Sequence, residues 1–599
     1  MTRFLLGGLA AAAALYLSAC GSAPPPPSPP PPALVRTPSD QLRVLVDRYW
    51  DDYLLLNPRP MPRAAAVRFD PGSGLDISAQ FLADSLSLER RYLDGVAALP
   101  RERLPPEAQL TYDLFKRERE LAVESFTYPA ELLPVNPFRS VPLEFARTGT
   151  GTGAYAILSA KDFDNWKLRA EDYVRWTDQA MANMREGLSR GYTQPRVLVA
   201  EILPVLNALA EDTSANPFYD PLRTIPGTLA EPERKRIADA IGFGVKSKIL
   251  PAYRALRNFL RDEYLPRSRQ SVALSALPLG ESWYAFLVRR ETSSRLKPAE
   301  LHALGLAEVE RLRGRLQSLL AEAGFAGDAQ AFYEAMRREP RTAFKTAAEL
   351  QNFYDQQKVE TATAIPALFE GLPQGDFAIR RLEPFLEATS PALTYQRAVN
   401  RNSPAILHVN TAGIEAAPIV PTIPQFLRRA IPGYHLQISI QDARGDLPRF
   451  RRQGGDPGFV EGWGLYAESL GNPLGLYRDT ESKFGALADQ LECAAGMVID
   501  TGVHALGWSR DQALGYLHAQ LPVDAAGATN AVDRIIALPG EALACAMGVR
   551  TIQGLRERAE QSLGPGFDLR AFHSELLNEG AMPLDFLDAK LNRWLKSPH

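Results

Sequence analysis

The chain has 599 residues, of which 45% are hydrophobic and 23% are charged, as in an ordinary globular protein. Lys and Arg number 67 against 70 Asp and Glu, so the formal net charge is -3. This near balance argues against nucleic acid or an anionic membrane surface as the main partner. The 7 His residues matter for function, because zinc sites usually use several of them.

The N-terminus is typical of an export signal. Arg3 supplies a positive start, and Phe4 to Ala19 form an apolar run shorter than the roughly 20 residues of a spanning helix. The run ends in Leu17-Ser-Ala-Cys20, which looks like the lipobox read by bacterial lipoprotein signal peptidase. We expect residues 1–19 to be a lipoprotein signal peptide and Cys20 to carry the lipid that enters the bilayer. The alternative is an uncleaved anchor, or a plain signal peptide in which Cys20 occurs by chance.

The residue after Cys20 predicts which membrane holds the protein. Gly21 stands where Asp would act as the usual signal for retention in the inner membrane. In an organism with two membranes, we therefore expect a cell-envelope protein in the outer membrane, facing the periplasm.

A proline-rich segment follows the lipidation site. Pro24 to Pro32 are interrupted only by Ser28. Proline fixes φ and donates no hydrogen bond, so residues 20–40 are expected to form a lipidated, polyproline-like tether. A ligand for a proline-recognition domain is the competing interpretation.

We expect residues 41–599 to form one mostly α-helical domain. An alternative is that this domain consists of two lobes around a cleft. Leucine stripes at helical spacing occur at Leu82, Leu86, Leu93 and Val96, and again from Leu301 to Leu319 between Pro298 and Gly324. A small β element is expected near residue 405, at Ala405–Asn410. Further helices are predicted at Trp166–Gly187, Glu231–Glu263, Thr346–Glu370, Glu461–Gly471, Thr480–Ala505 and Leu569–Leu577.

Several stretches are expected to be irregular. These are Asp212–Leu229, Pro373–Ser403 and the glycine-rich Gly149–Gly153. The last of them has no preceding strand of a βαβ unit, so it is interpreted as a flexible loop and not as a nucleotide loop. Cys493 and Cys545 are either bridged or two free buried thiols, because sequence alone cannot bring them within bonding distance.

One segment carries a resemblance to a known family. It runs Phe426-Leu-Arg-Arg-Ala-Ile-Pro-Gly-Tyr-His-Leu-Gln437 and is followed by Glu461-Gly-Trp-Gly-Leu-Tyr-Ala-Glu468. This resembles the bacterial lipoprotein family called domain of unknown function 885, with its HExxPGHHLQ and EGWALYAE motifs. Three further matches are Val498–Trp508 to its DTGxHxxGW block, Pro539–Ala544 to its PGQAL block, and Phe567–His573 with Gly580–Leu584 to its C-terminal segment.

The resemblance implies a gluzincin-like metallopeptidase body. In such a site the HE pair supplies a zinc ligand and a general base, a later His a second ligand, and the EGW glutamate a third. Neutral imidazole and carboxylate bind Zn²⁺ at about 2.0–2.2 Å, and an open position lets bound water ionise.

This sequence departs from the motif at its centre. Arg428 and Arg429 stand at the His-Glu positions, and Tyr434-His435 stands at the double His. Guanidinium has no lone pair for a metal. Two like charges 4 Å apart cost about 4 kcal/mol at an effective dielectric near 20, and a divalent ion doubles that. We therefore expect neither a metal nor another cofactor, with His435 and Glu461 as vestigial ligand positions and no confident catalytic residue.

A pairing follows from this charge exchange. Arg428 or Arg429 is expected to pair with Glu461, and Glu541 is a further candidate partner, because a buried unpaired carboxylate is costly. Asp500 and His504 are four residues apart, which could orient an imidazole for function or could serve helix capping. The predicted cleft residues are Arg428, Arg429, His435, Glu461, Asp500, His504 and Glu541.

Three functions remain open on the sequence. The first is a pseudoenzyme that has lost zinc hydrolysis and binds a peptide or another anion in the retained cleft. The second is a working hydrolase with relocated metal ligands, using zinc or another metal. The third is a structural envelope lipoprotein without a ligand.

Overall fold

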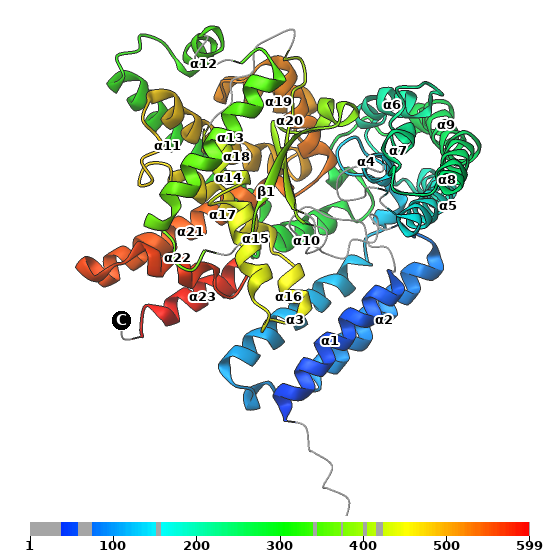
Figure 1. The fold of residues 1–599 in the computed structure, drawn as a ribbon. Coiled ribbons are helices and arrows are strands. Elements are labelled where there is room, and N and C mark those ends of the chain that lie inside the picture. The colour runs from blue at the N-terminus through cyan, green and yellow to red at the C-terminus, as the bar shows by residue number, and fades with distance from the viewer. Residues whose placement is uncertain are drawn as a thin grey trace, which may run out of the picture.

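The structure is a computed structural model that describes residues 37–57, 75–150, 157, 159–339, 344–372, 375–398, 404–414 and 423–597. It is mostly α-helical with one small sheet, as predicted (Figure 1). The signal peptide, Cys20 and the proline run lie outside the described residues. In the described part of the chain, no single helix has the length and apolar composition of a membrane span.

The N-terminal helices form a bundle below the rest of the body (Figure 1). They are α1 (Pro38–Leu56), α2 (Ala79–Ala97) and α3 (Pro106–Ser125). Helix α1 begins inside the stretch assigned to the tether, because Thr37 accepts a hydrogen bond from Asp40 N and Pro38 suits the first helical turn. The buried face of α2 is centred on residues such as Phe81, Leu88 and Tyr92, while three of the four residues of the predicted stripe flank it.

Helices α4 to α9 stand to one side of the body around an aromatic core (Figure 1). Continuous helical structure from residue 231 to 264, including two π-helical turns, confirms the predicted helix there. The stretch Asp212–Leu229 is less irregular than expected, since it holds a 3-10 turn and the short α7. Gly149 ends α4, whereas Gly151 to Gly153 lie outside the described residues. The bounds are α4 Val141–Gly149, α5 Ala160–Arg190, α6 Arg196–Ala210, α7 Pro221–Thr224, α8 Glu231–Gly244 and α9 Leu250–Phe259.

The sheet has three strands in the order β1-β3-β2. The central strand β3 (Ala405–Val409) is fully buried, pairs in parallel with β1 (Phe377–Arg381) and pairs antiparallel with β2 (Leu393–Gln396). The strand at residue 405 was predicted, but the irregular assignment of Pro373–Ser403 was wrong. Strand β1 ends in two arginines, and β2 alternates between buried and partly buried residues over only four positions.

The remaining helices make up the rest of the body. Predicted helix ends are confirmed at α11, which starts at Pro298 and is followed by Gly324 with a positive φ of 70°. The bounds are α10 Gly280–Thr292, α11 Pro298–Glu322, α12 Ala329–Arg338, α13 Ala347–Ala364, α14 Ile423–Arg429, α15 Tyr434–Ala443, α16 Arg449–Gln453, α17 Pro457–Ser469, α18 Thr480–His504, α19 Arg510–Gln520, α20 Ala525–Ala537, α21 Glu541–Leu563, α22 Leu569–Leu577 and α23 Leu584–Trp594.

Helices α17 and α21 touch through glycines. A Cβ added at Gly548 of α21 would lie 1.9 Å from Gly458 O and 2.6 Å from Gly462 Cα of α17. The backbones are therefore too close for any side chain at this crossing. This contact matters for the site, because α17 carries Glu461 and α21 carries Cys545 and Glu541.

Gly548→Ala is expected to lower the free energy of unfolding by roughly 1–3 kcal/mol, because the methyl group forces two helices apart. Gly554→Ala on the same helix is the matched control. A Cβ there meets nothing within 4 Å, so the better helix propensity of alanine should stabilise the protein by up to about 1 kcal/mol. Urea unfolding followed by circular dichroism measures both, and equal shifts in the two variants would contradict the close crossing.

Candidate functional site

A sharp bend between α14 and α15 brings residues 428 and 434 to the same point. Helix α14 ends at Arg429, and α15 begins at Tyr434 after Pro432 and Gly433. A Cβ on Gly433 would lie 1.9 Å from Arg428 O, so only glycine fits the turn. Trp463 of the EGW motif donates its indole N–H to Pro432 O and Gly433 O at 3.0 and 3.2 Å. The two motifs thus hold each other in place.

Arg428 lies in the middle of the site, and its side chain is only 12% exposed. Its Nη2 atom is 3.2 Å from Glu461 Oε2, and its Nη1 atom is 3.7 Å from Glu468 Oε1. The structure therefore contains the predicted pair of Arg428 and Glu461. The two carboxyl groups come from one helix, seven residues or about two turns apart, and so lie on the same face of α17.

Arg429 and Tyr434 complete the contacts of Glu461. Arg429 Nη1 donates to Tyr434 Oη at 2.7 Å and lies 3.9 Å from Glu461 Oε2, while Tyr434 donates to that same oxygen. Burial alone would raise the pKa of the Glu461 carboxyl, but the two arginines and the tyrosine hydrogen bond bring it below its usual range. Glu461 is therefore ionised at neutral pH.

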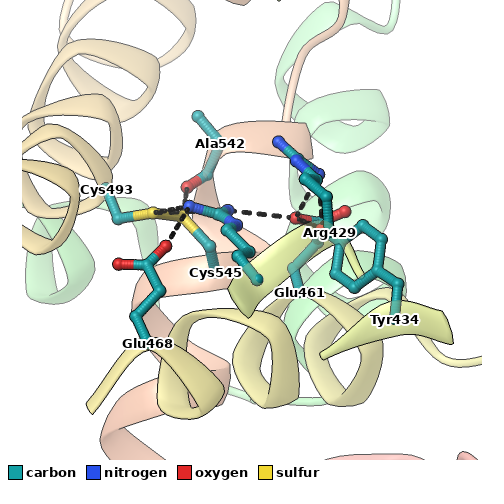
Figure 2. Close-up of a disulfide and its surroundings, with 8 residues drawn as sticks. Arg429, Tyr434, Glu461, Glu468, Cys493, Ala542 and Cys545 are labelled. Carbon is teal, nitrogen blue, oxygen red and sulfur yellow. Dashed lines mark hydrogen bonds and ion pairs between the residues drawn. A yellow bond between two sulfur atoms is a disulfide. The ribbon is translucent and has the colours of Figure 1, made fainter. Parts of the chain in front are cut away.

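We call Arg428, Arg429, Tyr434, Glu461 and Glu468 the arginine centre. Glu468 lies beside the Cys493–Cys545 disulfide on one side, and Glu461, Arg429 and Tyr434 lie on the other (Figure 2). The bridge settles the question that the sequence left open for the two cysteines. Both terminal nitrogens of Arg428 are 3.8 Å from Cys493 Sγ.

Glu468 and Asp489 are functional candidates that the sequence analysis missed. Glu468 is 0% exposed, and neither of its carboxyl oxygens has a hydrogen-bond partner among the described residues. Burial, with Asp489 nearby, raises the pKa of the Glu468 carboxyl well above its usual range. Burial likewise raises the pKa of Asp489 to about 7. The spacing of Glu461 and Glu468, which places both on one face of a helix, was the sequence signal that could have identified Glu468.

Glu541 is not a partner of Arg428 or Arg429, contrary to the suggested pairing. It binds Arg534 through one oxygen and Arg139 Nη2 through the other, at 2.6 Å for the latter. Burial would raise the pKa of Glu541, but these two arginines outweigh it and lower the pKa to about 2. The charge of Glu541 still acts on Glu461, so the two carboxylates belong to one neighbourhood.

The remaining predicted residues are held in separate structural contacts. His435 faces the sheet, where Nδ1 contacts Tyr395 Oη and Nε2 contacts Gly375 O, both at 3.1 Å. Burial lowers its pKa and keeps it neutral. The bend thus turns residue 434 toward Glu461 and residue 435 away from it, which is why the sequence could not decide between them.

Asp500 and His504 do not orient each other, although they are one helical turn apart. Asp500 accepts from Tyr284 Oη at 2.5 Å and from Gly540 N at 2.9 Å, which fixes the loop before α21. His504 Nδ1 accepts from Leu274 N at 3.2 Å, and Nε2 lies 3.0 Å from Ile535 O. Burial raises the pKa of Asp500 to about 7 and lowers that of His504 to about 4. Both residues therefore tie α18 to neighbouring segments.

The fold and the arginine centre together define a large α-helical protein with a buried cation among helices α14, α15, α17, α18 and α21. The chain belongs to the family described as bacterial protein of unknown function DUF885, whose sequence profile matches residues 72–591. No functionally curated protein matches the chain.

Two solved structures show the same fold. The first, from Colwellia psychrerythraea, is described as a candidate lipoprotein; it has a TM-score of 0.82 and 22% identity, covering 94% of this chain and 99% of that one. The second, from Shewanella oneidensis, is described as a candidate lipoprotein of unknown function; it has a TM-score of 0.63 and 14% identity, covering 93% and 100%. At these identities the likeness concerns the fold alone.

Proposed function

We propose that this chain is a cell-envelope protein, lipid-anchored through Cys20, that binds an anionic group at the open edge of the arginine centre and does not hydrolyse peptides with zinc. The lipobox, the proline-rich tether and the lipoprotein descriptions of the two fold neighbours support the anchor. Outer-membrane residence facing the periplasm follows from Gly21 if the organism has two membranes.

The residues at the centre do not fit a zinc ion. A catalytic zinc needs three protein ligands from His, Asp, Glu or Cys around one point. Here Arg428 fills the space beside Glu461, and Tyr434 occupies the ligand position that faces it. A guanidinium 3.2 Å from that carboxylate already supplies the positive charge that a metal would supply. This exchange of charge carries the proposal.

Anion binding is supported by the charges at the open edge. Arg429 and Glu461 are 24% and 30% exposed, and Arg139 and Arg534 lie beside the neighbouring Glu541. Together with Arg428, four arginines therefore lie in the neighbourhood of Glu461 and Glu541. Guanidinium groups bind carboxylates through paired, charge-assisted hydrogen bonds. A peptide carboxylate is the ligand class that this arrangement favours.

A hydrolase with relocated ligands has weaker support. It would have to draw on His435, Glu461, Asp500, His504 and Glu541. Among the described residues, no three His, Cys, Asp or Glu side chains are grouped so that they could hold a metal ion. A structural lipoprotein without a ligand would share the anchor and the fold but would not respond to carboxylates.

The ligand is tested with acetyl-trialanine, which has a free carboxylate, and with its C-terminal amide. At a hundredfold excess over Kd, the carboxylate form should stabilise the protein by about 2.7 kcal/mol and raise Tm, while the amide should not. Arg429→Gln should abolish the shift, and Arg257→Gln, at a partly exposed site on α9, should keep it. Equal shifts for both peptides, or none, would contradict carboxylate binding.

Metal content tests the other half of the proposal. Purified protein dialysed without chelator is expected to contain no stoichiometric zinc by atomic emission, and its melting temperature should not respond to added zinc. Stoichiometric zinc together with chelator-sensitive peptidase activity would establish the hydrolase instead.

A further inference from the structure

The Cys493–Cys545 disulfide lies against the arginine centre and joins two helices that build it. Cys493 is on α18, Cys545 is on α21, and both are buried with 7% and 8% of their surface exposed. Arg428 contacts Cys493 with both terminal nitrogens. Because guanidinium does not deprotonate in proteins, a permanent positive charge touches one sulfur of the bridge.

Such a contact changes the chemistry of the sulfur. A thiol beside a fixed cation has a lowered pKa, and a disulfide breaks faster when the leaving sulfur is a stable thiolate. Cys545 has a different environment, since its Sγ lies 3.8 Å from Ala542 O. The two sulfurs are therefore unequal, and Cys493 is the better leaving group.

We propose that Cys493 and Cys545 form a redox-modifiable site, in which Arg428 holds Cys493 as a thiolate once the bridge is reduced. A dithiol reductant attacks Cys545 Sγ, the bond between the cysteines breaks, and Cys493 leaves with the electron pair. The second thiol of the reductant then displaces Cys545, which takes up a proton. The reductant becomes a disulfide, two electrons pass to the protein, and one proton goes to solvent for each Cys493 that stays ionised.

The other charged groups around Cys493 act in both directions. Glu461 on α17 and Asp489 on α18 oppose a thiolate, and Glu492 does so weakly because it is exposed. Arg429 adds a second positive charge beyond Arg428. Glu468, whose Oε1 atom lies 3.7 Å from Arg428 Nη1, also opposes a thiolate, and its effect is lessened because burial raises the pKa of its carboxyl well above the usual range.

A link to ligand binding follows, and this step rests on the proposed function. Arg428 is shared between Glu461 and Cys493, so a thiolate at Cys493 would draw it away from Glu461. The open edge of the centre would then lose part of its positive charge. Carboxylate affinity is expected to be lower in the reduced protein than in the oxidised protein.

The test uses the full chain with Cys20→Ala, so that only the two cysteines of the bridge titrate. The protein is reduced with dithiothreitol, freed of reductant without oxygen, and titrated by the ultraviolet absorbance of thiolate. One cysteine is expected to titrate well below the usual value of about 8.5, at about 5–7.5. Alkylation followed by mass spectrometry should identify it as Cys493.

Variants show whether Arg428 is the cause. Arg428→Gln should return the pKa to about 8.5 or higher, Arg428→Lys should keep it low, and Arg429→Gln should change it little. If the Arg428→Gln variant does not fold, the titrations of the wild type and of Arg428→Lys still test whether the pKa of Cys493 is lowered. Both thiols titrating at or above about 8.5 in the wild type, or equal pKa values with and without Arg428, would overturn the proposal. If carboxylates bind neither redox form, only the proposed function fails, because the titration needs no ligand.

Discussion

Arg428→Ala is expected to lower the free energy of unfolding by about 3–5 kcal/mol, the cost typical of removing one partner from a buried ion pair. The guanidinium is 12% exposed and contacts Glu461, Glu468 and the disulfide. Its loss leaves the charge of Glu461 half-buried with weaker compensation from Arg429, and it opens a cavity between helices α14, α17 and α18. Urea and thermal unfolding of the purified variant measure the effect.

Two further variants test whether the charge of Arg428 is the reason for the loss of stability. Arg429→Ala should cost less than about 1 kcal/mol, because this side chain is more exposed and lies 3.9 Å from Glu461. Glu468→Gln should be neutral or stabilising at pH 7. A carboxyl with a raised folded-state pKa keeps a proton that the unfolded chain loses above about 4.3, so wild-type stability falls as pH rises and glutamine removes that loss. An Arg428→Ala variant as stable as Arg429→Ala would refute the pairing.

Cys545→Ala is expected to lower the free energy of unfolding by about 4 kcal/mol, because the bridge closes a loop between residues 52 apart. Dithiothreitol should destabilise the wild type by a similar amount and should leave the variant unchanged. Unfolding curves with and without reductant are recorded on the same preparation. They separate the contribution of the disulfide to the free energy of unfolding from the effect of the lost side-chain volume. A wild type indifferent to dithiothreitol while fully reduced would contradict this stabilisation.

The destabilising effects of Arg428→Ala and Cys545→Ala are not independent. Arg428 touches Cys493, so removing the bridge and removing the arginine disturb the same group of atoms. The double variant should therefore be destabilised by an amount that differs from the sum of the single variants.

Several helices could be predicted because their signals are local. Periodicity and end residues locate α11 between Pro298 and Gly324, and repeated apolar spacing locates α18. Strands β1 and β2 could not be predicted. Their residues become strands by pairing with the buried β3, since β1 ends in two arginines and the alternation of β2 covers only four residues.

The candidate site could be predicted in part. Two adjacent arginines, Arg428 and Arg429, and the acidic Glu461 are visible in the sequence, and the predicted pair of Arg428 and Glu461 is present in the structure. The separation of His435, Asp500 and His504 from this pair is not visible. Each of them is fixed by a backbone carbonyl or amide contributed by a distant segment.

By itself the sequence determined the helical class and placed two adjacent arginines, Arg428 and Arg429, in one motif and Glu461 in the next, because composition, periodicity and residue chemistry are properties of short stretches. Only the tertiary structure decided that Tyr434 and not His435 faces Glu461, that Glu468 is buried beside Arg428, and that Cys493 and Cys545 are bridged. These facts depend on the bend at Gly433 and on the close crossing of α17 and α21. The crossing joins segments far apart in the chain, and the bend is held by Trp463, 30 residues beyond Gly433, so no local pattern encodes either contact.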